Sequence, residues 1–218
     1  MSKIVIFGAG GRVGRAAVSE AVRRGHAVTA VVRDPAKYPD LAALEGVAVV
    51  RGDATDADSV ASVAAGHDAA VNASARLDTP SEQYFTAAAR ALLDGLTRAG
   101  VGRLLVLGIA TTLEVSPGAG VRVMDDPAFP EEYRVFSQGH VAEFELLLEE
   151  APAGLDWLMV VPPMDLNAQA PSTGSYRTAV GSVVEGAAGR ISHADLAVAL
   201  LDEIEAPRHR RVQLGVSG

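Results

Sequence analysis

A glycine-rich turn follows the first apolar segment of the chain and precedes a helical pattern. The apolar run 3–7 leads into Gly8-Ala9-Gly10-Gly11-Arg12-Val13-Gly14, and the helical pattern after it ends at Gly25. Glycine permits a tight turn, and backbone N–H groups at the beginning of a helix attract anions. The turn therefore predicts a site for the pyrophosphate of a dinucleotide. An ordinary strand-to-helix connection with spare glycines is the alternative.

The glycines follow the spacing G-x-x-G-x-x-G, and each has its own expected use. Gly8 allows the tight turn, Gly11 lets the backbone approach phosphate, and Gly14 lets the helix pack closely on the strand. Val13 occupies the last glycine position of the related pattern G-x-G-x-x-G, so the first spacing describes this chain better.

Arg33 follows the next strand-like segment, Ala27–Val32. NAD-selective proteins usually place a carboxylate there, on the ribose 2′-hydroxyl. An arginine can instead make a charge-assisted fork to a 2′-phosphate, and Arg12 adds a second positive charge in the turn. Asp34 keeps NAD(H) open, since a shift of one residue would bring a carboxylate to the ribose. The sequence favours NADP(H), and a surface pair of Arg33 and Asp34 is the alternative.

Polar residues also follow the third and fourth expected strands. Asp53-Ala54 is placed to hydrogen-bond the adenine amino group, and Asn72-Ala73-Ser74 is placed to line the path of the ribose and diphosphate. Asp, Asn and Ser are common turn formers, so both segments can equally be loop caps.

Three later residues are candidates for catalysis. Tyr133 can donate a proton or a hydrogen bond to a substrate, although aromatic packing at a helix start is the alternative. His140 can donate a proton near neutral pH, although a solvated histidine on a helix is the alternative. Thr111 supplies a hydroxyl after the fifth expected strand. The chain has no cysteine, and no group of His, Asp and Glu has metal-ligand spacing, so we predict no metal.

Strand-like and helical segments alternate along the chain, which implies parallel pairing. Strands are expected at 3–7, 27–32, 47–50, 68–71, 103–107 and 156–161, and helices at about 12–24, 56–65, 82–99, 131–150 and 192–205. We predict a Rossmann-type, doubly wound α/β fold in one domain, 1–218, with a mainly parallel sheet and flanking helices. Residues 163–190 are expected to form an irregular, substrate-side segment over the carboxyl edge of the sheet.

Three finer expectations concern side-chain faces and edges. Val13, Ala17 and Ala21 form one buried stripe of the first helix, and Val141, Phe144 and Leu148 point inward from the helix at 131–150. Ser192 and Asp195 begin the last helix with a capping-box-like pair. Residues 212–214 form a last edge strand.

Composition narrows the partners of the chain. The net charge is −8 over 218 residues, which argues against nucleic acid and anionic membranes as general partners. No apolar run has the length of a transmembrane helix, and the chain enters its first strand after two residues, without a signal peptide. We expect a cytoplasmic monomer or homodimer that acts on a small molecule.

These motifs together resemble the atypical short-chain dehydrogenase/reductase superfamily, in its NAD(P)H-binding subgroup. That subgroup includes candidate NADH–flavin reductases, biliverdin/flavin reductase-like proteins and NmrA-like redox sensors. The resemblance covers nearly the whole chain and is carried by residues 4–14, 31–37, 52–56, 154–157 with 162–163, and 191–197. It implies that Gly8, Gly10, Gly11, Arg12, Val13 and Gly14 bind the cofactor around its diphosphate, Arg33 the 2′-phosphate, Asp53 and Ala54 adenine, Asn72, Ala73 and Ser74 the ribose region, and Pro162 the nicotinamide side.

The chain departs from the superfamily at its usual catalytic Tyr-x-x-x-Lys pair. Four residues after Tyr133 stands Ser137, and no lysine occurs from Ser81 to the C-terminus. A threonine, Thr111, stands where a serine often follows the fifth strand. This departure disfavours alcohol–ketone, epimerase and dehydratase chemistry. It favours hydride transfer from NADPH to a conjugated acceptor, namely a flavin, a quinone or an enone.

The same sequence features are compatible with two other functions. A non-catalytic NADP-binding redox sensor of the NmrA-like type also needs no Tyr–Lys pair. A tailoring reductase or isomerase of a secondary metabolite is a third candidate. Turnover of NADPH separates the enzymes from the sensor.

Overall fold

The computed structural model describes residues 1–167, 170–187 and 189–218. Its main sheet has eight strands in the order β3-β2-β1-β4-β5-β6-β10-β8. These are β1 (Lys3–Phe7), β2 (Ala27–Val32), β3 (Val47–Arg51), β4 (Ala69–Asn72), β5 (Arg103–Leu107), β6 (Asp156–Val161), β8 (Arg177–Val180) and β10 (Gln213–Ser217). β8 pairs antiparallel with β10, whereas the other neighbours pair parallel. The predicted doubly wound, mainly parallel α/β fold is confirmed.

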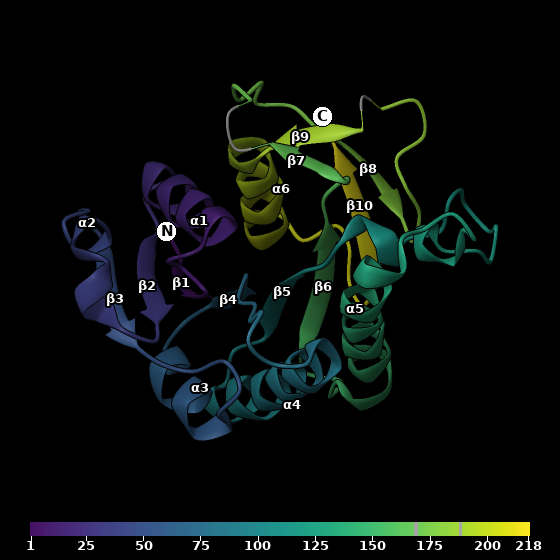
Figure 1. The fold of residues 1–218 in the computed structure, drawn as a ribbon. Helices are drawn as coiled ribbons and strands as arrows, with labels where there is room; N and C mark the ends of the chain where they lie inside the picture. Colours follow the sequence, from purple (N-terminus) through teal and green to yellow (C-terminus); the bar gives the residue numbers. More distant parts are fainter. Residues whose placement is uncertain (168–169, 188) are drawn as a thin grey trace.

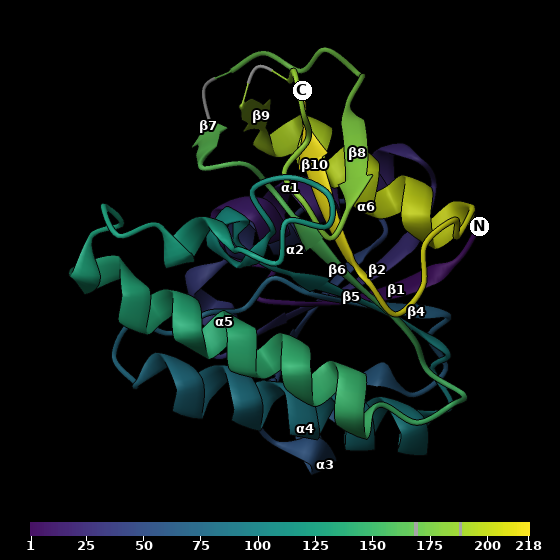
Figure 2. The same cartoon turned by 90° about the vertical axis from the view of Figure 1, so that its right-hand side faces the viewer.

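Helices cover both faces of this sheet (Figures 1 and 2). One face carries α1 (Arg12–Arg23) and α6 (His193–Glu205), and the other carries α3 (Ala57–Ala64), α4 (Ser81–Ala99) and α5 (Glu131–Glu150). Short helices occur in the connections: η1 (Pro35–Lys37), α2 (Pro39–Ala42), η2 (Ala110–Thr112) and η3 (Val123–Asp125). Of these short helices, η1 and α2 have a direct bearing on the site, because they follow Arg33.

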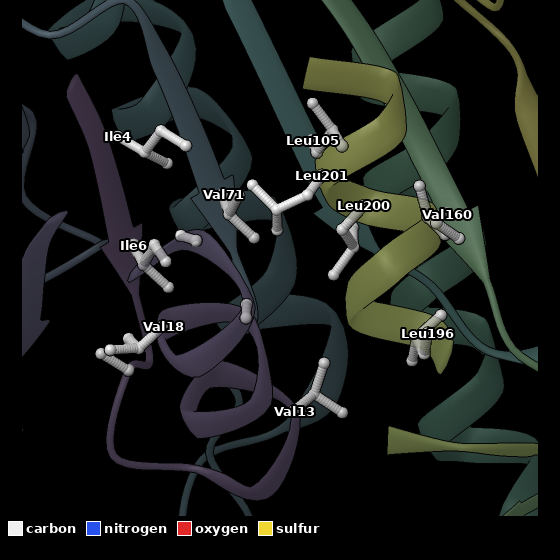
Figure 3. Packing of buried hydrophobic residues seen from close by; sticks show 14 of the residues in the cluster. Ile4, Ile6, Val13, Val18, Val71, Leu105, Val160, Leu196, Leu200 and Leu201 are labelled. Atoms are coloured by element: carbon white, nitrogen blue, oxygen red, sulfur yellow. The ribbon is translucent and has the colours of Figure 1, made fainter. Parts of the chain in front are cut away.

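The core has two layers because the strands are buried on both faces. In β1, Ile4 and Ile6 pack into the layer under α1 and α6, while Val5 and Phe7 pack into the layer under α3, α4 and α5. Figure 3 shows the first layer, where side chains of α6 lie against those of the central strands. The helical stripe of α1 is confirmed, since Val13, Ala17 and Ala21 are buried. These layers hold the carboxyl ends of β1, β2 and β4 in fixed register.

The predicted inward face of α5 is confirmed at Phe144, which packs against Trp157, and needs correction at Leu148. Leu148 is 51% exposed, whereas Leu147 is fully buried. The buried arc of α5 consists of Ser137, Gly139, His140, Glu143, Leu146 and Leu147. A hydrophobic pattern could not find this arc, because four of its six members are polar or lack a side chain.

The carboxyl-terminal third also differs from the expectation. Residues 163–190 are not wholly irregular, since they contain β7 (Asp165–Asn167) and β8, and β7 pairs in parallel with β9 (Arg190–Ser192) in a separate two-stranded sheet. Residues 168, 169 and 188 of the predicted segment lie outside the described residues. The last strand is β10, which lies between β6 and β8 and is therefore not an edge strand.

The expected start of the last helix is confirmed. The Ser192 hydroxyl accepts a hydrogen bond from the Asp195 backbone N–H at 2.9 Å. Within the described parts of the chain, no helix combines the length and the apolar character needed to cross a membrane.

Candidate functional site

The glycine turn between β1 and α1 is tight because its spaced glycines lie against backbone. Gly8 has a φ of +73°, in the left-handed region that favours glycine. A Cβ on Gly14 would lie 2.1 Å from the Gly8 carbonyl oxygen, so α1 packs directly on the turn. Gly11 is the N-cap of α1, and because glycine has no side chain, no capping hydrogen bond is made to the first backbone N–H groups of the helix. The backbone N–H groups of the first turn of α1 therefore form an end to which an anion can bind.

A cavity of about 240 Å³ opens beside this turn, at the carboxyl edge of the sheet. It is lined by Phe7, Gly8, Gly10, Gly11, Val31, Val32, Arg33, Tyr38, Gly52, Asp53, Ala54, Ala73, Ser74, Ala75, Arg76 and Tyr84. The glycine turn, the end of β2 and the segments after β3 and β4 thus share one cavity. This is the position in which doubly wound sheets bind ligands, and the residue types fit a dinucleotide.

Three charged side chains line this cavity: Arg33 after β2, Asp53 after β3 and Arg76 after β4. Arg33 makes no hydrogen bond or ion pair with the described residues, whereas Arg76 forms a two-armed pair with Asp78 at 2.8 and 2.7 Å. That pairing lowers the pKa of Asp78 to about 2. Burial opposes the ionisation of Asp53, but hydrogen bonds from Thr55 and the positive charges of Arg76 and Arg33 hold its pKa below the usual value. The cavity therefore holds one unpaired guanidinium and one ionised carboxylate.

A chain of hydrogen bonds involving the Tyr84 and Ser74 hydroxyls holds the segment after β4. Tyr84 donates to the Ser74 hydroxyl at 2.8 Å, and Ser74 donates to the Asn72 side-chain oxygen at 2.5 Å. Because Asn72 is buried at the end of β4, this chain fixes the segment after β4 against α4. The arrangement gives the cavity a rigid polar wall.

The structure divides the predicted cofactor residues into two groups. Those that line the cavity are Gly8, Gly10, Gly11, Arg33, Asp53, Ala54, Ala73 and Ser74. Arg12, Val13, Gly14, Asn72 and Pro162 are not among its lining residues. Of these five, Arg12 is exposed and the other four are buried. The cofactor contacts assigned to both groups stay predictions.

Among the lining residues with polar side chains, three are not predicted from the sequence, namely Tyr38, Arg76 and Tyr84. Arg76 stands two residues after Ser74, so a longer segment after β4 would have included it. Tyr84 lies in the first turn of α4, and it reaches the cavity because α4 begins beside the end of β4. Tyr38 had no such signal, because its place depends on how the segment after β2 folds back.

None of the three catalytic candidates, Thr111, Tyr133 and His140, is among the residues that line the cavity. Thr111 is 5% exposed, and its Oγ1 donates to the Ser137 Oγ at 2.9 Å. Ser137 in turn donates to the Tyr133 carbonyl oxygen at 3.0 Å. The Tyr133 side chain is 59% exposed on the first turn of α5, so aromatic packing does not explain it. A role for Thr111 or Tyr133 in catalysis stays a prediction.

His140 is buried, which corrects the alternative of a solvated histidine. Its ring lies 3.8 Å from the Phe85 ring, centroid to centroid, and its Nδ1 lies 3.0 Å from Glu143 Oε2. Burial raises the pKa of Glu143, although the hydrogen bond with His140 opposes this. The pair is enclosed between α4 and α5, and a catalytic role for His140 is untested. In the described residues, no group of three or more His, Cys, Asp and Glu side chains is arranged for a metal ion.

Comparison with known proteins agrees with this geometry. Residues 8–207 match the model of a family described as NAD(P)H-binding, so the chain belongs to that NAD(P)H-binding family. A curated relative is the uncharacterized protein YwnB of Bacillus subtilis (strain 168). It is 34% identical over 217 residues, which cover 98% of this chain and 97% of the relative.

Two solved structures are similar to the chain over nearly its whole length. A candidate NADH-flavin reductase from Streptococcus pneumoniae TIGR4 is 28% identical with a TM-score of 0.85, and the match covers 100% of this chain and 99% of that one. A candidate epimerase from Bacteroides thetaiotaomicron is 32% identical with a TM-score of 0.86, and the match covers 99% and 96%. The predicted resemblance is confirmed at the level of this NAD(P)-binding, oxidoreductase-like family.

Proposed function

We propose that the chain is an NADPH-dependent reductase that transfers hydride to a conjugated acceptor: a flavin, a quinone or an enone. The observation that supports NADPH as the cofactor is that the glycine turn and Arg33 line the same cavity. Arg33 has no ion-pair partner among the described residues, so its guanidinium can fork to a 2′-phosphate without breaking a contact. Family membership supports NAD(P)H, and Arg33 supports the 2′-phosphate form.

The cofactor is proposed to lie along the carboxyl edge of the sheet. Gly11 and the first turn of α1 would bind the diphosphate, while Arg33 and Asp53 would bind the adenosine end. Ser74, which is held by its hydrogen bond to Asn72, would orient the ribose region, and Pro162 would bound the nicotinamide side. When bound, the reduced nicotinamide supplies a hydride.

Thr111, after the end of β5, and Ser137, in the second turn of α5, support a conjugated acceptor. The hydroxyl protons of Thr111 and Ser137 are both donated inside the protein, and no lysine occurs from Ser81 onward. An acceptor that needs a strong protein acid at its oxygen would find none in this arrangement. A conjugated acceptor delocalises the two incoming electrons and takes its proton from water, so positioning supplies most of the catalysis. The candidate NADH-flavin reductase from S. pneumoniae supports this class.

NADPH oxidation tests this function directly. The loss of reduced-nicotinamide absorbance is followed with a panel of flavins, quinones, enones and simple ketones, and NADPH binding is titrated on the same sample. The proposal predicts turnover with at least one conjugated acceptor and none with the ketones. Tight NADPH binding without turnover on the whole panel contradicts the reductase and favours the redox sensor. Turnover with simple ketones contradicts the proposed acceptor class.

A further inference from the structure

The side chain of Tyr38 lies directly on Gly10 of the glycine turn. A Cβ built on Gly10 would stand 2.3 Å from Tyr38 Cε1 and Cζ, and 2.6 Å from its hydroxyl oxygen. Any residue with a side chain at position 10 would therefore displace the ring. Gly10 has no positive φ, so backbone freedom does not explain the glycine there. The space taken by the Tyr38 ring does.

Arg15 contacts both Gly10 and Tyr38 and so stabilises their contact. Its Nε donates to the Gly10 carbonyl oxygen at 3.1 Å, and its guanidinium carbon lies 5.4 Å from the centroid of the Tyr38 ring. The guanidinium also forms an ion pair with Asp40. Gly10 and Arg15 belong to the phosphate-binding turn and α1, whereas Tyr38 and Asp40 belong to the segment after β2. The four residues therefore join these two parts of the cavity.

The segment held in this way also carries Arg33. Arg33 and Tyr38 stand five residues apart and line the same cavity. Arg33 makes no hydrogen bond or ion pair with the described residues, so the course of its backbone has a large part in where its guanidinium lies. That backbone is fixed at one end by β2 and at the other by the contact of Tyr38 with Gly10.

We propose that Tyr38 is a positioning residue for cofactor selectivity, which it exerts by resting on Gly10 and holding Arg33 toward the 2′-phosphate of NADP(H). This inference rests on the proposed NADP(H) site. The Tyr38 hydroxyl makes no hydrogen bond with the described residues, so the ring carries the effect. Both NAD(H) and NADP(H) share the diphosphate. Loss of the contact therefore weakens NADP(H) binding more than NAD(H) binding.

The test compares dissociation constants of NADP and NAD by titration calorimetry for four proteins. These are the wild type, Tyr38→Ala, Tyr38→Phe and Gly10→Ala. We expect the preference for NADP to fall about fivefold or more in Tyr38→Ala and in Gly10→Ala, because residues in contact couple at this scale. Tyr38→Phe keeps the ring and should keep the preference. The double variant Gly10→Ala/Tyr38→Ala should lose no more preference than either single variant.

The outcomes separate this inference from the proposed function. If the wild type prefers NADP and both alanine variants keep that preference, the positioning role is wrong while the cofactor site stands. Additive losses in the double variant also contradict it, since they show that the two residues act independently. If the wild type binds neither nucleotide, both proposals fail. A melting temperature close to that of the wild type for Tyr38→Ala shows that the loss of preference is local.

Discussion

The Thr111 hydroxyl donates a 2.9 Å hydrogen bond to the Ser137 hydroxyl, and this bond ties the segment after β5 to α5. Both side chains are buried, and the Ser137 hydroxyl donates its own hydrogen bond to the Tyr133 carbonyl oxygen. Each of the two hydroxyls therefore donates its hydrogen bond inside the protein.

Replacement of Thr111 by valine should leave turnover nearly intact. Valine keeps the shape but removes the donor, so the free energy of unfolding should fall by about 1 kcal/mol, as for one neutral hydrogen bond. Steady-state kinetics with the accepted acceptor and urea unfolding measure the two effects. A hundredfold loss of kcat at unchanged stability would instead show that Thr111 acts on the substrate.

Replacement of Arg33 by alanine should remove most of the preference for NADPH over NADH. Hydrogen bonds to charged groups contribute about 1.5–3 kcal/mol, so NADPH binding should weaken by about tenfold or more while NADH binding changes little. Titration of both nucleotides measures this. Arg177→Ala is the matched control, because Arg177 is exposed on β8 and does not line the cavity. Equal weakening of both nucleotides by Arg33→Ala would refute the 2′-phosphate assignment.

Gly14 should tolerate no side chain. A Cβ there would stand 2.1 Å from the Gly8 carbonyl oxygen and 2.8 Å from Ala9 Cα, and both neighbours are backbone. Gly14→Ala should lower the free energy of unfolding by about 2 kcal/mol or more, as overpacking of this kind does. Gly154→Ala is the control, since no atom lies within 4 Å of its added Cβ. Denaturant unfolding of the two variants gives the comparison, and equal stability would show that the turn is looser than the structure indicates.

Asp195 should make folding sensitive to acid. Burial opposes its ionisation, but hydrogen bonds from the Thr173 and Gly174 backbones and from the Ser172 and Ser192 hydroxyls hold its pKa below the usual value. The carboxylate therefore contributes stability that is complete above the unfolded pKa, near 3.9, and is lost as pH falls through the lower folded pKa.

Asp195→Asn removes this titration. The variant should be less stable than the wild type at pH 7, and the difference should shrink as the pH approaches the folded pKa. Urea unfolding across this pH range measures the difference. A gap between the two proteins that does not change with pH would contradict the role of the charged form.

The sequence predicted the elements whose signals are local. Residues 3–33 form one strand, turn, helix and strand as expected, since glycine spacing and apolar periodicity lie within one short window. The order of β8 and β10 could not be predicted, because pairing at that edge depends on contacts between distant segments. The buried face of α5 was predicted only in part, at Phe144, because Gly139 and Glu143 carry no hydrophobic signal. In the site, Arg33 and Asp53 followed strand ends and were found. Tyr38 was missed, because its position depends on the return of the chain to Gly10.

A crystal structure with bound NADP would show directly where the cofactor lies. We expect one dinucleotide along the carboxyl edge of the sheet, with its diphosphate at Gly11 and the first turn of α1 and its 2′-phosphate within hydrogen-bond distance of the Arg33 guanidinium. A dinucleotide bound elsewhere, or a 2′-phosphate that points away from Arg33 into solvent, would contradict the proposed site.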